Sequence, residues 1–170
     1  MTEIREERPG DIASIHAVNT RAFGRDREAR IVDALRSNNA VSLSLVAIRE
    51  HKLIGHIMYS PVMVGGATGA GLAPLAVLPE HQRRGIGSEL VRAGNQRLEA
   101  AGCRFIVVIG HPSFYPRFGF KPAGMYDITC HWNVPDDAFM VAMLSEPAAD
   151  VKGVAQYRPE FSTVLSGVLH

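Results

Sequence analysis

The sequence predicts a single α/β (α+β) domain, built on a mixed, mostly antiparallel sheet of about seven strands flanked by about four helices. Three observations lead to this prediction. The 170 residues are 46% hydrophobic and 21% charged, an ordinary composition for one globular domain. An apolar hairpin pattern occupies residues 41–64, and a strand, helix, strand pattern occupies residues 72–109. The hydrophobic period therefore switches between two, typical of strands, and about 3.6, typical of helices.

A short strand and two helices are expected first. Residues 2–7 alternate as a strand does, and the turn residues 8–11 then break it. Apolar side chains recur at helical spacing across residues 12–22, and Gly24 is expected to end that helix. A second helix is predicted at Arg27–Arg36.

The hairpin comes next. Residues 41–48 form its first strand and residues 53–64 its second, with a polar turn between them. Pro61 cannot donate to a ladder, so we expect a bulge or a sheet edge there. Four glycines within residues 65–71 predict a loop or turn.

The strand, helix, strand pattern predicts a crossover between parallel strands. An apolar run at residues 72–78 reads as a buried strand, and an amphipathic helix begins at Gly85. Gly102 is expected to stop the helix, and residues 104–109 form another buried strand. Such a unit is most simply right-handed.

The remainder of the chain has weaker patterns. Ser113 is placed to cap one short helical turn that Gly119 closes. Strands are expected to begin at Phe120 and to span Ala138–Leu144, whereas residues 145–170 show no strong periodicity.

Charge, apolar runs and cysteines exclude several classes. A net charge of +1 gives no reason to expect nucleic acid as a partner. The longest apolar stretches, residues 72–79 and 105–109, are far shorter than the roughly 18 residues that span a bilayer. Cys103 and Cys130 fit no zinc spacing, and no metal site is expected. Without an N-terminal secretion segment, we expect reduced thiols in a cytoplasmic protein.

The most informative segment is Pro79-Glu80-His81-Gln82-Arg83-Arg84-Gly85-Ile86-Gly87-Ser88, between a buried strand and an amphipathic helix. A helix N-terminus presents unpaired backbone N–H groups and a partial positive charge. Glycines let an oxyanion approach those donors, and Arg83 and Arg84 add full charges. The segment therefore predicts an anion site, most naturally for phosphate.

Two common phosphate motifs do not fit this segment. The third glycine of a dinucleotide fingerprint is replaced by Leu90, and the Gly-Lys-Ser/Thr of a P-loop is missing. A purely structural interpretation also stays open, in which the glycines serve packing alone.

The residues Gln82 to Gly87 resemble the Q/R-x-x-G-x-G/A pyrophosphate motif of the GNAT superfamily of acyl-CoA-dependent N-acetyltransferases. Leu75-Ala76-Val77-Leu78-Pro79-Glu80 is similar to the family's fourth strand. Phe114-Tyr115-Pro116-Arg117-Phe118-Gly119-Phe120 resembles its downstream segment. This form, together with Tyr157-Arg158-Pro159-Glu160-Phe161, looks most like the YhbS-like branch.

The resemblance implies a GNAT-like fold over residues 1–170, with acetyl-CoA as cosubstrate. The backbone of Leu75, Ala76 and Val77 would pair with the pantetheine arm where the fourth and fifth strands part. Many members hold that arm through an Asn shortly before the Tyr, and here Ser113 is expected to replace it. The other residues expected at the cofactor are Gln82, Arg83, Arg84, Gly85, Ile86, Gly87 and Ser88 at the pyrophosphate, and Phe114.

Tyr115 matches the position that in many family members gives a proton to the departing CoA thiolate. A phenol with an ordinary pKa near 10 can protonate a thiolate as it forms. A strand N–H near Val77 would stabilise the oxyanion. The alternative for Tyr115 is a structural aromatic side chain that packs beside Phe114, Phe118 and Phe120.

The residue that removes the proton from the amine is less evident. Glu80 lies near a strand end and His111 at the tip of the next strand, so both are candidates. Glu80 is alternatively an acid in the first turn of a helix, and His111 a plain turn residue. We prefer His111, because the imidazole pKa lies near working pH. His56 is expected to be a surface or internally satisfied histidine.

The resemblance implies direct transfer of acetyl to a primary amine of a small molecule, without a covalent enzyme intermediate. One alternative keeps the enzyme and makes the acceptor a protein N-terminus or a lysine. A second alternative is a catalytically silent acyl-CoA-binding domain that regulates. Family analogy also allows a homodimer.

Overall fold

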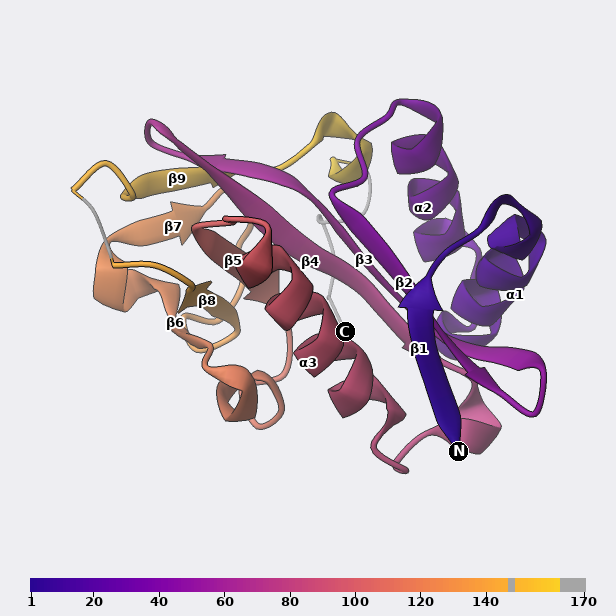
Figure 1. Ribbon diagram of the computed structural model, residues 1–170. Helices are drawn as coiled ribbons and strands as arrows, with labels where there is room; N and C mark the ends of the chain where they lie inside the picture. Colours follow the sequence, from indigo (N-terminus) through magenta and orange to yellow (C-terminus); the bar gives the residue numbers. More distant parts are fainter. Residues whose placement is uncertain (147–148, 163–170) are drawn as a thin grey trace. The chain divides into compact units, whose positions relative to one another are not determined.

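The computed structural model describes residues 1–146 and 149–162 (Figure 1). The chain forms two compact units. The first unit comprises Met1–Tyr59 and Ala73–Arg97, and the second comprises Ser60–Leu72 and Leu98–His170. The described residues contain nine strands and three α-helices, so the predicted class is confirmed with slightly different counts. The elements are β1 (Thr2–Glu6), α1 (Ile12–Phe23), α2 (Arg27–Ser37), β2 (Leu43–Arg49), β3 (Lys52–Val64), β4 (Ala67–Val77), α3 (Ile86–Ala100), β5 (Phe105–Ile109), β6 (Lys121–Pro122), β7 (Ile128–Cys130), β8 (Phe139–Met143) and β9 (Gly153–Gln156).

The strands are hydrogen-bonded in the order β1-β2-β3-β4-β5-β8-β6, and β9 pairs with both β3 and β7. β1 with β2, β2 with β3, β5 with β8, and β6 with β8 are antiparallel. β4 and β5 are parallel, as predicted for a crossover through α3. The sheet is therefore mixed and mostly antiparallel, as the sequence predicts.

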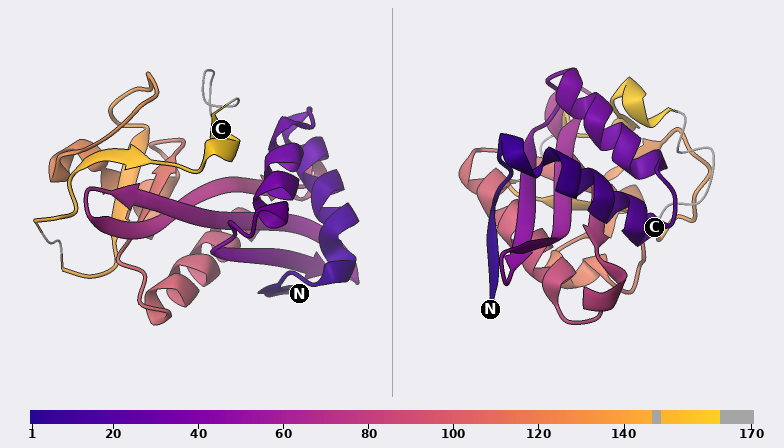
Figure 2. Two further views of the ribbon diagram at one scale, coloured as in Figure 1. Left: turned by 90° about the horizontal axis from the view of Figure 1, so that it is seen from above. Right: turned by 90° about the vertical axis from the view of Figure 1, so that its right-hand side faces the viewer.

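In the first unit, helices cover both faces of β3. Successive side chains of a strand point to opposite faces. His56 meets Asn19 of α1 at 3.0 Å. At Gly55, one residue earlier, a Cβ would lie 3.1 Å from Leu90 and 3.3 Å from Ile86, both in α3. Hence α1 packs on one face of β3 and α3 on the other, and both views of Figure 2 show α1 and α2 side by side on the first face.

Several predicted boundaries are confirmed. Gly24 ends α1 in the left-handed region with φ 69°, and its N–H donates to the Thr20 carbonyl at 2.9 Å. Pro61 lies beyond the last β2 partner of β3, Tyr59, and before the β9 pairing that begins at Met63. It therefore occupies an edge position, where a missing N–H costs no ladder hydrogen bond.

The prediction of a loop across residues 65–71 is wrong, because β4 already begins at Ala67. Only the turn at Gly65 and Gly66 matches it. Gly69 lies inside β4, where a Cβ would come within 2.5 Å of the Phe105 ring. The glycines of this strand make room for aromatic rings that come from distant parts of the chain.

The second unit has its own core between β5, β8 and β9. Phe105 and Val107 of β5, Phe139 and Val141 of β8, and Ala155 of β9 are at most 5% exposed. The last strand, β9, falls in the region where the sequence shows no strong pattern. Residues 147–148 and 163–170 of that region lie outside the described residues.

Candidate active site

The predicted anion-binding segment joins β4 to α3 in the first unit. A short 3-10 turn at Pro79–His81 follows β4, and the Gln82 side-chain amide donates to the Val77 carbonyl at 2.9 Å. Arg83 then adopts φ +62° and Gly85 φ +84°, both in the left-handed region. A non-glycine residue at positive φ is uncommon and concentrates at functional sites. The loop therefore has a special backbone shape that Gln82 helps to hold.

This loop leaves backbone donors open. The first bond of α3 runs from the Glu89 N–H to the Gly85 carbonyl at 3.0 Å. Among the described residues, none accepts a hydrogen bond from the backbone N–H groups of residues 83–88. Arg83 and Arg84 are exposed beside them, whereas Ile86 is buried and anchors the helix start. Open N–H groups, the helix dipole and two guanidinium groups are suited to a phosphate-type anion.

The end of β4 alternates in exposure. Ala76 is 1% exposed, whereas Leu75 and Val77 are partly exposed. The end of β4 therefore has one buried face and one partly exposed face.

Glu80, one of the two candidate bases, is bound to another residue. Both of its carboxylate oxygens accept from the Arg21 guanidinium, at 3.0 and 2.9 Å. Its own backbone N–H and Arg21 lower the pKa of this exposed carboxyl. A carboxylate with a lowered pKa and an ion-pair partner is a weak base.

Tyr115, the candidate acid, lies in the second unit and is 5% exposed. Its ring stands edge-on to Phe114 at 4.9 Å and to Phe120 at 5.6 Å. It also covers Gly110, where a Cβ would lie 2.4 Å from Tyr115 Cε2. Burial raises the pKa of Tyr115 above the ordinary value assumed from the sequence. The ring is firmly packed and its phenol holds its proton more tightly than a free tyrosine.

The short turn before Tyr115 is more exposed. His111 and Ser113 are exposed, and Phe114 is half-buried with the Arg117 guanidinium 5.0 Å from its ring centre. The His111 carbonyl accepts from the Phe114 N–H at 3.1 Å, so the backbone of this residue holds the turn. Its side chain is exposed to solvent.

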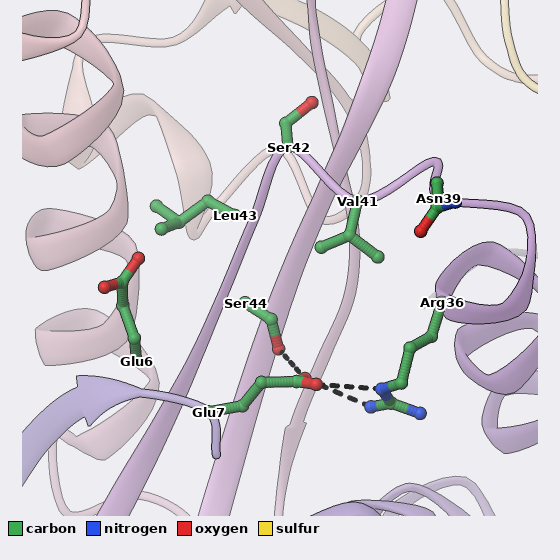
Figure 3. A pocket seen from close by; sticks show the side chains of 8 residues that line it. All are labelled: Glu6, Glu7, Arg36, Asn39, Val41, Ser42, Leu43 and Ser44. Atoms are coloured by element: carbon green, nitrogen blue, oxygen red, sulfur yellow. Dashed lines mark hydrogen bonds and ion pairs between the residues drawn. The ribbon is translucent and has the colours of Figure 1, made fainter. Parts of the chain in front are cut away.

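A partly buried polar cluster in the first unit has no counterpart among the predicted sites (Figure 3). Glu7 accepts from the Arg36 guanidinium at 2.8 and 3.1 Å and also from the Ser44 hydroxyl. The cluster forms one wall of a pocket of about 440 Å³. The residues that line this pocket are Glu6, Glu7, Arg36, Asn39, Val41, Ser42, Leu43 and Ser44.

Asn19 sets the direction of the hydrogen bonds in this cluster. Its Nδ2 donates to the Ile15 carbonyl at 3.0 Å, so the same NH₂ group faces His56 Nδ1, which accepts. His56 Nε2 then carries the proton and donates to Ser44 Oγ at 2.9 Å, and Ser44 donates to Glu7. His56 is fully buried, and desolvation lowers its pKa to about 3. The imidazole therefore acts as a neutral link between α1 and β2 and not as a base for Ser44.

Two other groups were not predicted from the sequence. The buried hydroxyls of Ser60 and Tyr157 have no hydrogen-bond partner among the described residues. Tyr157 stands in a motif that the sequence singles out, but no periodicity indicates that its hydroxyl is buried.

Cys103 does not have the environment of a nucleophile. Its thiol donates to the Phe105 carbonyl at 3.3 Å, and burial raises its pKa. Residues 1–146 and 149–162 contain no cluster of three or more His, Cys, Asp or Glu side chains suited to a metal ion. In that same part of the chain, no helix combines the length and the apolar character needed to cross a membrane.

The mixed sheet, with its parallel β4–β5 pair joined through α3, is of the α/β class, and an open helix start suited to a phosphate-type anion follows β4. More particularly, the chain belongs to the Acetyltransferase (GNAT) family, whose pattern it matches over residues 11–120. The protein is therefore an N-acetyltransferase, as the resemblance implies.

Individual relatives agree with this assignment. The chain is 37% identical over 163 residues to the uncharacterised N-acetyltransferase YhbS of Escherichia coli, which covers 94% of this chain and 98% of the relative. The crystal structure of that protein with CoA superposes with a TM-score of 0.90, over 95% of this chain and 92% of the other. A GNAT acetyltransferase from Brucella melitensis in complex with acetyl-CoA has 37% identity and a TM-score of 0.81, over 95% and 98% of the two chains.

Proposed function

We propose that the protein transfers an acetyl group from acetyl-CoA to a primary amine of a small molecule, by direct attack in a ternary complex. The observation that supports this most is the loop at residues 82–88, with its open N–H groups and exposed Arg83 and Arg84. Relatives at 36% and 37% identity were crystallised with CoA and with acetyl-CoA. We propose further that residues 1–170 work as one N-acetyltransferase domain.

Each unit contributes separate residues to the proposed reaction. In the first, the backbone at Leu75–Val77 pairs with the pantetheine arm, and Gln82–Ser88 bind the pyrophosphate. In the second, Ser113 and Phe114 contact the cofactor, and Tyr115 protonates the departing thiolate. A raised phenol pKa keeps this donor protonated at neutral pH, and it transfers its proton only to the thiolate that forms beside it.

The proton of the attacking ammonium needs its own acceptor. We assign this role to His111, whose imidazole is exposed, and no longer to Glu80, whose carboxylate is held by Arg21. His111→Gln should lower kcat with a small amine. An unchanged kcat would leave deprotonation to solvent.

Calorimetric titration with acetyl-CoA, CoA and ATP tests the cofactor. We expect micromolar binding of both CoA species and none of ATP. Binding of both CoA species should be strongly weakened in the double variant Arg83→Ala/Arg84→Ala and in the variant Gly87→Trp. Arg27→Ala, which removes an exposed arginine at the start of α2, is the matched control for charge.

Turnover separates the remaining alternatives. Acetylation of small primary amines supports the proposed function, and acetylation of peptides alone would favour a protein acceptor. Cofactor binding without any turnover would mean a catalytically silent acyl-CoA-binding domain.

A further inference from the structure

Two buried hydroxyls in the second unit make no hydrogen bond with any described residue. Ser60 of β3 is 0% exposed, and the Tyr157 hydroxyl oxygen is also buried. Buried polar side-chain atoms in folded proteins nearly always have a partner, so a pair of exceptions in one unit needs an explanation.

Both hydroxyls belong to the same face of the sheet. Ser60 and Val62 are two residues apart on β3, so their side chains point the same way. At Gly71 of β4, a Cβ would lie 2.7 Å from Val62 and 3.1 Å from the Tyr157 ring. The Tyr157 ring therefore covers Gly71 on one face of the sheet. The side chains of Val62 and Ser60 point to that same face.

Gly71 also marks a particular position along the sheet, the end of the parallel pairing between β4 and β5. Gly71 pairs with Val107, and this is the last pair of the parallel β4–β5 ladder. In the proposed function, the acyl chain of the cofactor enters where these two strands stop pairing. Within the second unit, the Tyr157 ring therefore lies at the end of the β4–β5 ladder.

The surroundings of Tyr157 are apolar. Its ring lies edge-on to Trp132 at 5.0 Å and to Phe161 at 5.7 Å. The nearby carboxylate of Glu160 is held by Arg158 at 3.0 Å. Such a setting disfavours a charged ammonium and suits a neutral amine on an apolar or aromatic carrier.

We propose that the hydroxyls of Ser60 and Tyr157 bind the acceptor, a neutral primary amine on an apolar or aromatic carrier, and orient its nitrogen for attack. This inference rests on the proposed function. A neutral primary amine has two N–H donors and one lone pair. The two hydroxyl oxygens accept the two N–H groups, and the lone pair is left for the thioester carbonyl.

With these groups, every bond and every proton of the reaction is accounted for. The ammonium first loses one proton to His111, the base assigned above. The amine then forms the C–N bond as the C–S bond breaks. The nitrogen gives its second proton to solvent, and the thiolate takes one proton from Tyr115, which is reprotonated from solvent. Ser60 and Tyr157 orient the amine and neither gain nor lose a proton overall.

The test compares Tyr157→Phe and Ser60→Ala with Tyr126→Phe, a half-buried tyrosine that packs against the same core. Steady-state rates are measured at saturating acetyl-CoA with phenethylamine and N-methylphenethylamine, which offers one N–H in place of two. Loss of one hydrogen bond should raise KM for phenethylamine by up to about tenfold in each test variant, with kcat nearly unchanged. Their preference for the primary amine should shrink, and Tyr126→Phe should behave as wild type.

Several outcomes would overturn the inference. If Tyr157→Phe and Ser60→Ala have a higher Tm than wild type and unchanged kinetics with both amines, the two hydroxyls have no role in acceptor binding. A loss confined to kcat would place them at the transition state instead of the amine. A wild-type enzyme that acetylates neither amine would contradict the inferred acceptor class. Calorimetry with acetyl-CoA and turnover of a panel of small amines keep the two proposals apart. Failure of this inference alone leaves cofactor binding and turnover of other small amines intact, whereas failure of the proposed function removes cofactor binding or all turnover of small amines.

Discussion

Replacing Gly110 by alanine should displace the ring of Tyr115 and slow acetyl transfer. The new Cβ would lie 2.4 Å from Cε2 and 2.9 Å from Cδ2 of that ring. Carbon atoms pack comfortably at about 3.5 Å or more, so the ring has to move by about 1 Å. Phe114 and Phe120 stand edge-on to it and limit where it can go. A displacement of this size at a proton donor can lower kcat by up to about 100-fold.

The same substitution should also lower stability by about 1–3 kcal/mol, because it overpacks a filled core. For a chain of this length the Tm should fall by roughly 2–4 °C for each kcal/mol. Gly124→Ala is the matched control, since a Cβ there meets nothing within 4 Å and its backbone is not at positive φ. The assay is kcat with a primary amine, measured in wild type, Gly110→Ala, Tyr115→Phe and the double variant. If the ring displacement acts through the phenol, Gly110→Ala should add little in the Tyr115→Phe background. Full activity of Gly110→Ala would refute the assignment of Tyr115.

Three further predictions concern the buried groups. Ser44→Ala removes a partner from both His56 and the Glu7 carboxylate, so denaturant unfolding should show a loss of about 1–3 kcal/mol; exposed Ser42→Ala is the control, and equal losses in the two would contradict the network. His56 has a pKa of about 3 in the folded protein and near 6.5 when unfolded, so the unfolded state takes up the proton first on acidification. Stability should therefore fall as the pH drops below about 6.5, by up to about 1.4 kcal/mol per pH unit, and unfolding curves of His56→Gln between about pH 7 and pH 5 should lack that slope. Because burial raises the pKa of Tyr115, the ratio of wild-type to Tyr115→Phe activity should stay constant from about pH 7 to about pH 10, and a decline within that range would count against it.

Local signals explain what the sequence could predict. The period-two and helical patterns locate β2, β3, α1, α2 and α3, and Gly24 and Gly102 end their helices at positive φ as expected. The loop between β4 and α3 is also local, since its chemistry depends on consecutive residues and on a helix start that they themselves form. Its open N–H groups were therefore predictable, whereas the positive φ of Arg83 was not.

The hydroxyls of Ser60 and Tyr157 could not be predicted in the same way, because burial without a partner depends on residues far apart in the chain. Ser60 occurs in an apolar strand, where a small polar residue carries no pattern of its own. Glu80 gives the same lesson, since its ion pair with Arg21 joins residues that are 59 positions apart. A site formed by consecutive residues can be predicted from the sequence. A site that depends on contacts between distant residues cannot.

The glycines of β4 show why one strong local signal misled. Glycine-rich segments usually indicate turns, because glycine tolerates positive φ. Gly65 follows that rule at φ +60°, but no positive φ is found at Gly69 or Gly71. What these two positions require is the absence of a Cβ, since the rings of Phe105 and Tyr157 occupy that space. The sequence reports only that a side chain is missing, and the reason can be backbone freedom or close approach. Where glycines alternate with small residues and lead directly into an apolar run, as from Ala67 onward, close approach within a strand is the better interpretation.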